Sequence, residues 1–246
     1  MIRINNFFEN NNDKINEKHD NYEKIMFIYK AALKILKTKV EILNEQYDLF
    51  YEYKPIEYIT TRIKSEESIK AKLKRKKMDL TYQNMFEEIN DIAGIRIVCN
   101  FKDDVYKIVE EIENFQDIRI LKKKDYMKKP KTSGYMSYHI VVEVPINFVK
   151  ETLYVKAEIQ VRTIGMDFWA NLEHKLKYKN DAITKKQSKE LVKYAKLINN
   201  IDDNMLLIAN QNAKQNQIAV ASEVSNHKKP IEKENIFKTD KFKFDL

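Results

Sequence analysis

Apolar side chains recur at spacings of three and four residues along several stretches, and the first covers residues 22–51. Its apolar positions are Ile25, Ile28, Ala32, Ile35, Leu36, Val40 and Leu43. This spacing predicts an amphipathic helix, which ends at Lys54-Pro55 because the residue before a proline is disfavoured in the α region. Similar patterns predict helices over residues 65–77, with Ser65 as N-cap, and over residues 103–114, 166–178 and 186–212.

Other stretches are short and rich in β-branched and aromatic residues, which is typical of strands. They cover residues 56–63, 95–99, 118–121, 137–144 and 153–161. The last two form a hairpin-like pair. Because strands and helices interleave, we expect an α/β or α+β sheet domain with long helices at both ends. The apolar stripes of those end helices make the domain a candidate for oligomerisation.

The two ends of the chain lack this periodicity. Residues 1–21 are polar and rich in asparagine, so we expect a disordered leader, and residues 214–246 read as a charged, mobile tail. The domain itself then covers residues 22–213. The sequence holds no apolar run of the roughly 20 residues that a membrane span needs. Its single cysteine, Cys99, excludes an internal disulfide framework, fits a reducing compartment such as the cytoplasm, and reads as a buried strand residue.

Charge points to anionic partners. The chain of 246 residues carries a formal net charge of +8, which favours nucleotides or nucleic acid. A coding bias is the alternative, because lysine, asparagine and isoleucine abound while only 3 glycines occur. The position of the basic residues relative to carboxylates and aromatics therefore decides the matter.

Four polar groups follow the first predicted strand: Arg62, Lys64, Ser68 and Lys72. The last three are four residues apart, so they share one face wherever the segment is helical. A hydroxyl between two ammonium groups near a helix start suits phosphate, and Arg62 could lie flat on a base. The alternative is an exposed basic helix face.

A carboxylate stands at the entrance of the second strand, in Asp91-x-x-Gly94-x-Arg96. Glycine lets the backbone approach a ligand, and a carboxylate there suits Mg²⁺. Arg96 lies on an otherwise apolar strand, where a charge is costly unless it is paired. A structural Asp91–Arg96 ion pair is therefore the alternative.

Residues 128–139 combine lysines, tyrosines, a histidine and one of the scarce glycines. In this loop Lys131 and His139 suit phosphate, whereas Tyr135 offers a face on which a purine can stack. Gly134 gives the backbone freedom. The alternative is an ordinary turn that leads into a strand.

Glu158, Gln160 and Arg162 alternate along the last predicted strand, so they share one face of the sheet. If Asp91 and Arg96 lie on that face too, two carboxylates and several cations converge, as metal-assisted phosphoryl chemistry requires. The alternative is a solvent-facing strand side.

The predicted helix over residues 166–178 adds Asp167, Trp169, Glu173 and His174. Trp169 reads as a core residue, and Glu173 and His174 are weaker candidates for the site.

In this order, the motifs resemble the RelA/SpoT-type synthetase domain and, more closely, the stand-alone small alarmone synthetases of bacteria. The resemblance covers residues 22–213. It rests on Arg62-x-Lys64-x-x-x-Ser68-x-x-x-Lys72, Asp91-x-x-Gly94-x-Arg96, Lys131-x-x-Gly134-Tyr135-x-Ser137-x-His139, Glu158-x-Gln160-x-Arg162-Thr163 and Phe168-Trp169-x-x-x-Glu173-His174.

The resemblance implies an α+β fold related to polymerase β-type nucleotidyltransferases, with a mixed sheet flanked by helices. It also implies a transfer of the β,γ-pyrophosphate of ATP to the ribose 3′-hydroxyl of GDP or GTP, which leaves AMP. It implies that Arg62 and Arg96 hold the adenine of ATP between them. It also implies that Lys64, Ser68 and Lys72 bind the ATP phosphates. It implies that Asp91 and Glu158 are catalytic and bind Mg²⁺, with Glu158 taking the hydroxyl proton. The acceptor-side residues that it implies are Lys124, Lys131, Tyr135, His139, Gln160 and Asp167.

The chain also departs from the family pattern. Lys122-x-Lys124-Asp125 stands where long members often carry Arg-x-Lys-Asp, a pattern linked to acceptor preference. The family resemblance favours a homotetramer, yet Glu41 and Asn44 occupy a region in which some members use basic side chains to bind an activating alarmone. We therefore expect different regulation here.

Two other functions stay open from the residues. A basic RNA-binding module would need neither Asp91 nor Glu158 and would bind RNA with a steep salt dependence. A different nucleotidyltransferase would release pyrophosphate in place of AMP.

Overall fold

The computed structural model describes residue 15 and residues 19–149, 151–179 and 184–226. Contacts divide the chain into two units, Met1–Leu206 and Leu207–Leu246. The first unit holds the sheet and the candidate site described below. Within the described residues, no helix is both long and apolar enough to serve as a membrane span.

The elements alternate much as the sequence predicts. Along the chain they are α1 (His19–Tyr51), β1 (Ile56–Ile63), α2 (Glu66–Arg75), α3 (Tyr82–Glu88), β2 (Ala93–Cys99), α4 (Lys102–Glu113), β3 (Arg119–Asp125), β4 (Tyr138–Asn147), β5 (Thr152–Thr163), α5 (Ile164–Lys179) and α6 (Lys185–Asn226). Ser65 caps α2 as predicted, because its side chain accepts a hydrogen bond from the backbone N–H of Ser68.

Three elements differ most from the prediction. The short helix α3 was missed, and β3 runs four residues past the predicted end at position 121. The extra part of β3 is a lysine run, which carries little strand propensity but is typical of an edge strand. Helix α6 continues to Asn226, so residues 214–226 of the expected tail have helical backbone. The remaining tail and nearly all of the expected leader lie outside the described residues.

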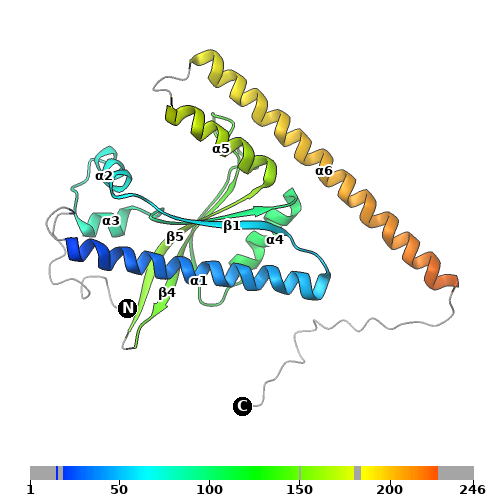
Figure 1. Ribbon diagram of the computed structural model, residues 1–246, viewed down its shortest axis with the longest axis horizontal. Helices are drawn as coiled ribbons and strands as arrows, with labels where there is room; N and C mark the ends of the chain where they lie inside the picture. Colours follow the sequence, from blue (N-terminus) through cyan, green and yellow to red (C-terminus); the bar gives the residue numbers. More distant parts are fainter. Residues whose placement is uncertain (1–14, 16–18, 150, 180–183, 227–246) are drawn as a thin grey trace. The chain divides into compact units, whose positions relative to one another are not determined.

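The five strands form one mixed sheet in the order β1-β2-β5-β4-β3. The β2–β5 pair is parallel, and the other neighbours are antiparallel. Strand β5 is therefore the central strand, and the expectation of a mixed sheet flanked by helices is confirmed (Figure 1).

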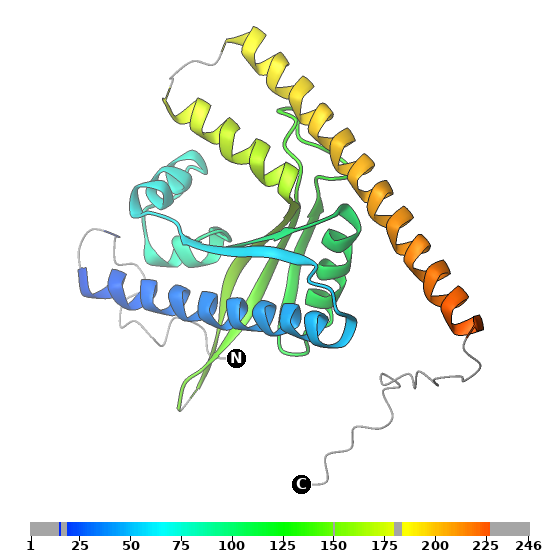
Figure 2. The ribbon, with the colours of Figure 1, turned by 45° about the vertical axis from the view of Figure 1, so that its right-hand side comes forward.

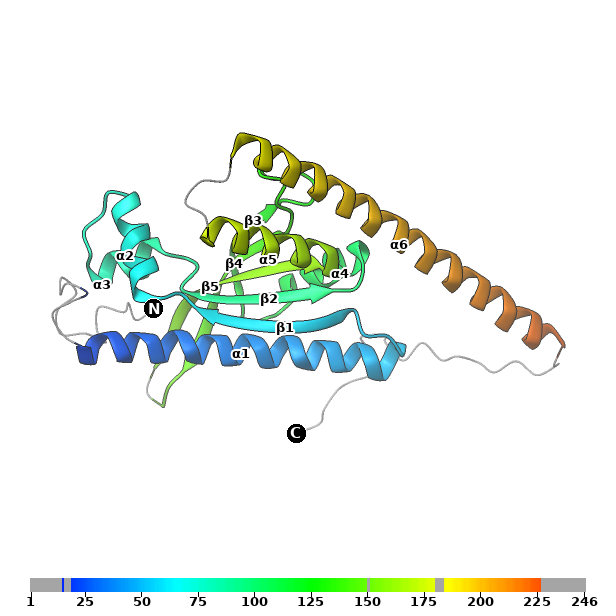
Figure 3. The same ribbon diagram turned by 45° about the horizontal axis from the view of Figure 1, so that its top comes forward.

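The two faces of the sheet differ in character. Helices α1 and α4 cover one face, where their apolar side chains join those of the strands in one continuous core. The two helices also touch each other, since the Tyr47 hydroxyl donates to Glu111 over 2.6 Å. Helix α5 lies on the other side of the sheet, away from α1 (Figures 2 and 3). That second face carries the polar residues of the strands.

Candidate active site

Strand register arranges the polar side chains in two rows across the sheet. One row pairs Arg62 with Gly94, Gly94 with Glu158, Glu158 with Val141, and Val141 with Lys122. The next row runs from Thr60 through Arg96, Gln160 and His139 to Lys124. Because neighbouring strands lie about 4.8 Å apart, segments far apart in sequence converge on one surface.

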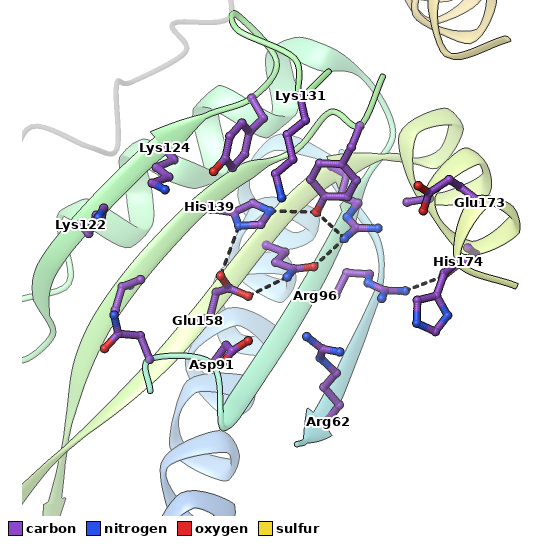
Figure 4. A pocket seen from close by; sticks show the side chains of 18 of the residues that line it. Arg62, Asp91, Arg96, Lys122, Lys124, Lys131, His139, Glu158, Glu173 and His174 are labelled. Atoms are coloured by element: carbon purple, nitrogen blue, oxygen red, sulfur yellow. Dashed lines mark hydrogen bonds and ion pairs between the residues drawn. The ribbon is translucent and has the colours of Figure 1, made fainter. Parts of the chain in front are cut away.

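These rows form the floor of a cavity of about 530 Å³ (Figure 4). Most of the residues that the sequence singled out line it: Arg62, Lys72, Asp91, Arg96, Lys124, Lys131, Tyr135, His139, Glu158 and Gln160, together with Lys122, Glu173 and His174. Lys64, Ser68 and Asp167 are not among the lining residues.

Asp91 ties the donor-side lysines together. Its two carboxylate oxygens accept from Lys64 Nζ at 3.0 Å and from Lys72 Nζ at 2.8 Å. Burial raises the pKa of Asp91, but the hydrogen bond from Lys72 and the charges of both lysines outweigh it and hold the pKa below its ordinary value. Arg96 pairs with Asp167 at 3.1 Å, so the alternative Asp91–Arg96 ion pair is wrong.

Arg62 lies across Gly94. A Cβ atom added to Gly94 would stand 3.3 Å from both Cγ and Nε of Arg62, so the missing side chain leaves room for the arginine. Ser68 sits farther back, where its hydroxyl accepts a hydrogen bond from the Ser65 hydroxyl at 3.0 Å.

A chain of polar contacts runs over the acceptor side to Glu158. Arg162 Nη2 donates to the Tyr135 hydroxyl at 2.8 Å, and that hydroxyl lies 2.8 Å from His139 Nε2. Because a guanidinium can only donate, the Tyr135 hydroxyl accepts from Arg162, and the same hydroxyl also contacts the His139 ring. His139 Nδ1 lies 3.3 Å from Glu158.

Glu158 receives a second hydrogen bond, from Gln160 Nε2 at 2.7 Å. Burial raises the pKa of Glu158, whereas the hydrogen bond and charge of His139 and the amide of Gln160 lower it, and the lowering prevails. The nearby Asp91 carboxylate opposes that lowering. Glu158 is therefore ionised at neutral pH.

The two carboxylates, Asp91 and Glu158, are the candidates for a metal site. Groups of three or more metal-binding side chains do not occur in the described part of the chain. Mg²⁺ does not need such a cage, because it is commonly held by one or two carboxylates while water and substrate phosphates complete its shell. Hard oxygen donors on ionised carboxylates fit that ion.

The segment of residues 126–139, which we call the acceptor loop and which runs into the start of β4, is built around aromatic rings. Lys131 Nζ lies 4.8 Å from the centroid of the Tyr126 ring and 4.7 Å from that of Tyr135. Gly134 adopts a φ of +90°, and a Cβ there would stand 2.7 Å from Cβ of Ala195 on α6. The loop therefore rests directly on α6.

Trp169 supports the same contact from α5. It is 5% exposed, packs with Ala195, and donates its Nε1–H to the Leu191 carbonyl at 3.0 Å. Its assignment to the core is confirmed, as is that of Cys99, which is buried on β2.

Asp167 requires a correction. We expected it to contact the acceptor, but it is 1% exposed and stands behind the arginines that line the cavity. Its carboxylate lies 3.1 Å from both Arg96 and Arg162. A side chain enclosed in this way contacts other protein groups and supports the site from beneath.

Sequence reasoning placed Arg162 on the polar face of the last strand without giving it a specific role, and it did not single out Tyr126. Both line the cavity. The signal for Arg162 was its place two residues after Gln160 on an alternating strand. The signal for Tyr126 was an aromatic residue inside a lysine run, which only the fold of the loop turns towards Tyr135.

Comparison with known proteins agrees with this geometry. A family model described as a region found in RelA and SpoT proteins matches residues 61–183. The GTP pyrophosphokinase YwaC of Bacillus subtilis is 43% identical over 195 residues, which span 79% of this chain and 93% of that relative.

Solved structures give the same result. The crystal structure of small alarmone synthetase 2 from B. subtilis matches with a TM-score of 0.71 at 42% identity, covering 78% of this chain and 99% of that one. Small alarmone synthetase 1 from B. subtilis, in a structure bound to its product pppGpp, matches with a TM-score of 0.73 at 34% identity and covers 78% and 97%. The chain belongs to the RelA/SpoT family, within its small alarmone synthetases.

Proposed function

We propose that this chain is a GTP pyrophosphokinase that transfers the β,γ-pyrophosphate of ATP to the 3′-hydroxyl of GDP or GTP, making (p)ppGpp and AMP. The observation that carries the proposal is the placement of two ionised carboxylates, Asp91 and Glu158, between two groups of cations in one cavity. A site that only bound polyanions would gain nothing from acids at its centre.

The donor binds on the β1–β2 side. Arg62 and Arg96 lie on neighbouring strands, where their planar guanidinium groups enclose adenine. Lys64, Lys72 and Ser68 bind the ATP phosphates. The lysines then exchange the Asp91 carboxylate, which they contact in this structure, for phosphate oxygens.

The acceptor binds on the β4–β3 side. Tyr135 stacks on guanine, and Lys124, Lys131 and His139 face the acceptor phosphates. Gln160, which lines the cavity beside Glu158, contacts the ribose side of the acceptor.

Glu158 takes the proton from the acceptor 3′-hydroxyl. The 3′-oxygen bonds to the β-phosphorus of ATP, the bond from that phosphorus to the α,β-bridging oxygen breaks, and AMP leaves with the electron pair. The low pKa makes Glu158 a weak base, which suffices because positioning and charge neutralisation do most of the work in phosphoryl transfer. Asp91 and Glu158 also hold Mg²⁺, which when bound neutralises phosphate charge.

The proposal also covers the oligomeric state and the cellular compartment. The described part of α5 carries four exposed apolar side chains at intervals of four residues, Ile164, Phe168, Leu172 and Leu176, which suits a contact between copies. We take a homotetramer as the assembly and the cytoplasm as the compartment. The buried cysteine and the nucleotide substrates support that compartment. RNA is a secondary partner, favoured only by the net charge of +8.

The test is a product assay with ATP, Mg²⁺ and GMP, GDP and GTP as competing acceptors. We expect AMP and a 3′-pyrophosphorylated guanosine nucleotide from the wild type, and a loss of product by at least 100-fold in Glu158→Gln. Glu143→Gln is the matched control, because Glu143 lies on β4 outside the lining residues and pairs with Arg119.

Other outcomes would identify a different protein. Release of pyrophosphate in place of AMP would indicate another nucleotidyltransferase. Salt-dependent RNA binding without either product, and with Glu158→Gln equal to the wild type, would indicate an RNA-binding module.

A further inference from the structure

Beneath the cavity, one buried carboxylate gathers groups from three separate elements. Asp167, in the first turn of α5, is 1% exposed. It contacts Tyr58 on β1, Arg96 on β2 and Arg162 on β5. Buried polar groups are normally hydrogen-bonded, and the partners of the Asp167 carboxylate come from several elements at once.

The two oxygens of Asp167 divide their partners by charge. Oδ1 lies 3.1 Å from Arg96 Nη1 and 3.1 Å from Arg162 Nη1, so a single oxygen serves both guanidinium groups. Oδ2 accepts from the Tyr58 hydroxyl at 2.7 Å and from Asn171 Nδ2 at 2.6 Å. The two neutral donors thus fix the carboxylate in place for the two cations.

The two arginines lead to opposite halves of the cavity. Arg96 lines the donor half, where Asn171 holds it in addition by a 3.0 Å hydrogen bond. Arg162 reaches Tyr135, the residue that we assign to guanine, at 2.8 Å. Asp167 is therefore linked to the adenine site through Arg96, and to the guanine site through Arg162 and Tyr135.

We propose that Asp167 is a positioning residue that sets both nucleotide-binding halves at once, by holding Arg96 and Arg162 on one oxygen. The inference rests on the function proposed above. Asp167 keeps the two guanidinium groups at a fixed separation, so that the groups that stack on adenine and on guanine keep a constant relative position.

Charge repulsion explains why losing the Asp167 carboxylate would affect both nucleotide-binding halves. Arg162 is 3% exposed, and burial lowers its pKa, with the charge of Arg96 acting in the same direction. The two guanidinium groups repel each other in a poorly solvated place, and Asp167 offsets that repulsion. Without its charge, each arginine moves away from the other, and both binding geometries change.

The test compares Asp167→Asn with Asp104→Asn. Asp104 is a matched control, because it is also buried, at 7% exposure, and accepts a tyrosine hydroxyl at 2.6 Å, yet it lies outside the cavity lining. Calorimetry measures the Kd of GDP and, separately, that of α,β-methylene ATP. In Asp167→Asn we expect both Kd values to rise by about tenfold, the scale of one charge-assisted contact.

Steady-state kinetics separates positioning from mere support of the fold. A partly unfolded enzyme loses kcat in proportion to its active fraction and keeps its KM, whereas we expect Asp167→Asn to raise KM for both nucleotides more than it lowers kcat. Asp104→Asn should leave both Kd values within about twofold of the wild type.

A milder variant keeps the inference testable if Asp167→Asn does not fold. Tyr58→Phe removes one donor to Asp167 from an edge strand, at a residue that is 39% exposed, and we expect about a threefold rise in both Kd values. A rise in one Kd alone, no rise in either, or an equal effect of Asp104→Asn would overturn the inference. A wild type that binds both nucleotides and forms no AMP would refute the proposed function instead.

Discussion

A single methyl group added to the acceptor loop, in Gly134→Ala, tests whether the seat of that loop on α6 controls guanine-nucleotide binding. Gly134 lies next to Tyr135, and its amide donates to the Lys131 carbonyl at 2.8 Å, closing the turn. Alanine at this position meets two obstacles: a φ of +90° and the Ala195 methyl group.

The structure gives the size of the effect. A positive φ costs alanine about 1–2 kcal/mol. The new Cβ would lie 2.7 Å from Ala195 Cβ, and relief to about 3.5 Å requires a shift of about 0.8 Å. The same shift would stretch the 2.8 Å Tyr135–His139 hydrogen bond to about 3.6 Å, beyond its useful range. Together these terms reach about 2–3 kcal/mol, or roughly a 30- to 150-fold weaker Kd for GDP.

Calorimetry of GDP and α,β-methylene ATP with Gly134→Ala is the assay. We expect GDP binding to weaken while the analogue keeps its Kd, because the described hydrogen bonds and ion pairs of Lys64, Lys72 and Arg96 are made outside this loop. Ala195→Gly in the same chain removes the clash and should recover part of the loss, leaving the cost of the positive φ. Ala195→Gly alone is the control for the cost of glycine in a helix, about 1 kcal/mol. Unchanged GDP affinity, or equal weakening of both nucleotides, would refute the reasoning.

Two further predictions concern the donor corner and acid. Asp91→Asn frees Lys64 and Lys72 from their carboxylate. Without Mg²⁺, ATP should therefore bind to this variant at least as tightly as to the wild type, while product formation is lost. Weaker Mg²⁺-free binding would show that the lysines do not turn to phosphate. Asp91 and Glu158 both have pKa values held below their ordinary 3.8 and 4.5, so their stabilising contribution is complete above about pH 5 and disappears as the pH falls through the lowered values. Urea denaturation between pH 5 and pH 3 should show this loss, and Asp91→Asn should show a shallower one; an equal slope in both proteins would contradict the assignment.

Most of the fold could be predicted because periodicity is a local signal. The apolar positions from Ile25 to Leu43 define one helix face whatever lies opposite, and all but one of them lie fully in the core of the structure. Helix α3 was missed because its seven residues are too few to show a period. The lysine part of β3 was missed because an edge strand needs little burial, so composition does not mark it.

The site was predicted less evenly. The carboxylates and lysines that line the cavity stand in short motifs, and their convergence follows from the strand order, which places β5 between β2 and β4. The predicted contact of Asp167 with the acceptor was wrong, because a sequence motif does not show whether a helical side chain points into the cavity or lies beneath it. Tyr126 was missed as a site residue, and Arg162 was placed on the polar face without its partner, because their contacts with Lys131 and Tyr135 are made across the chain.

The central position of β5 also decides which parts of the site can open by themselves. Glu158 lies on a strand that is hydrogen-bonded on both sides and packed over the main core, and amides of such strands exchange with solvent only when the whole domain unfolds. Lys72, in contrast, lies on a helix of ten residues, and Lys131 lies in a loop. Such elements open locally at a much smaller free-energy cost. Hydrogen exchange should therefore be slow around the base and faster around the phosphate-binding groups, so that nucleotides can enter and leave while the proton acceptor stays in place.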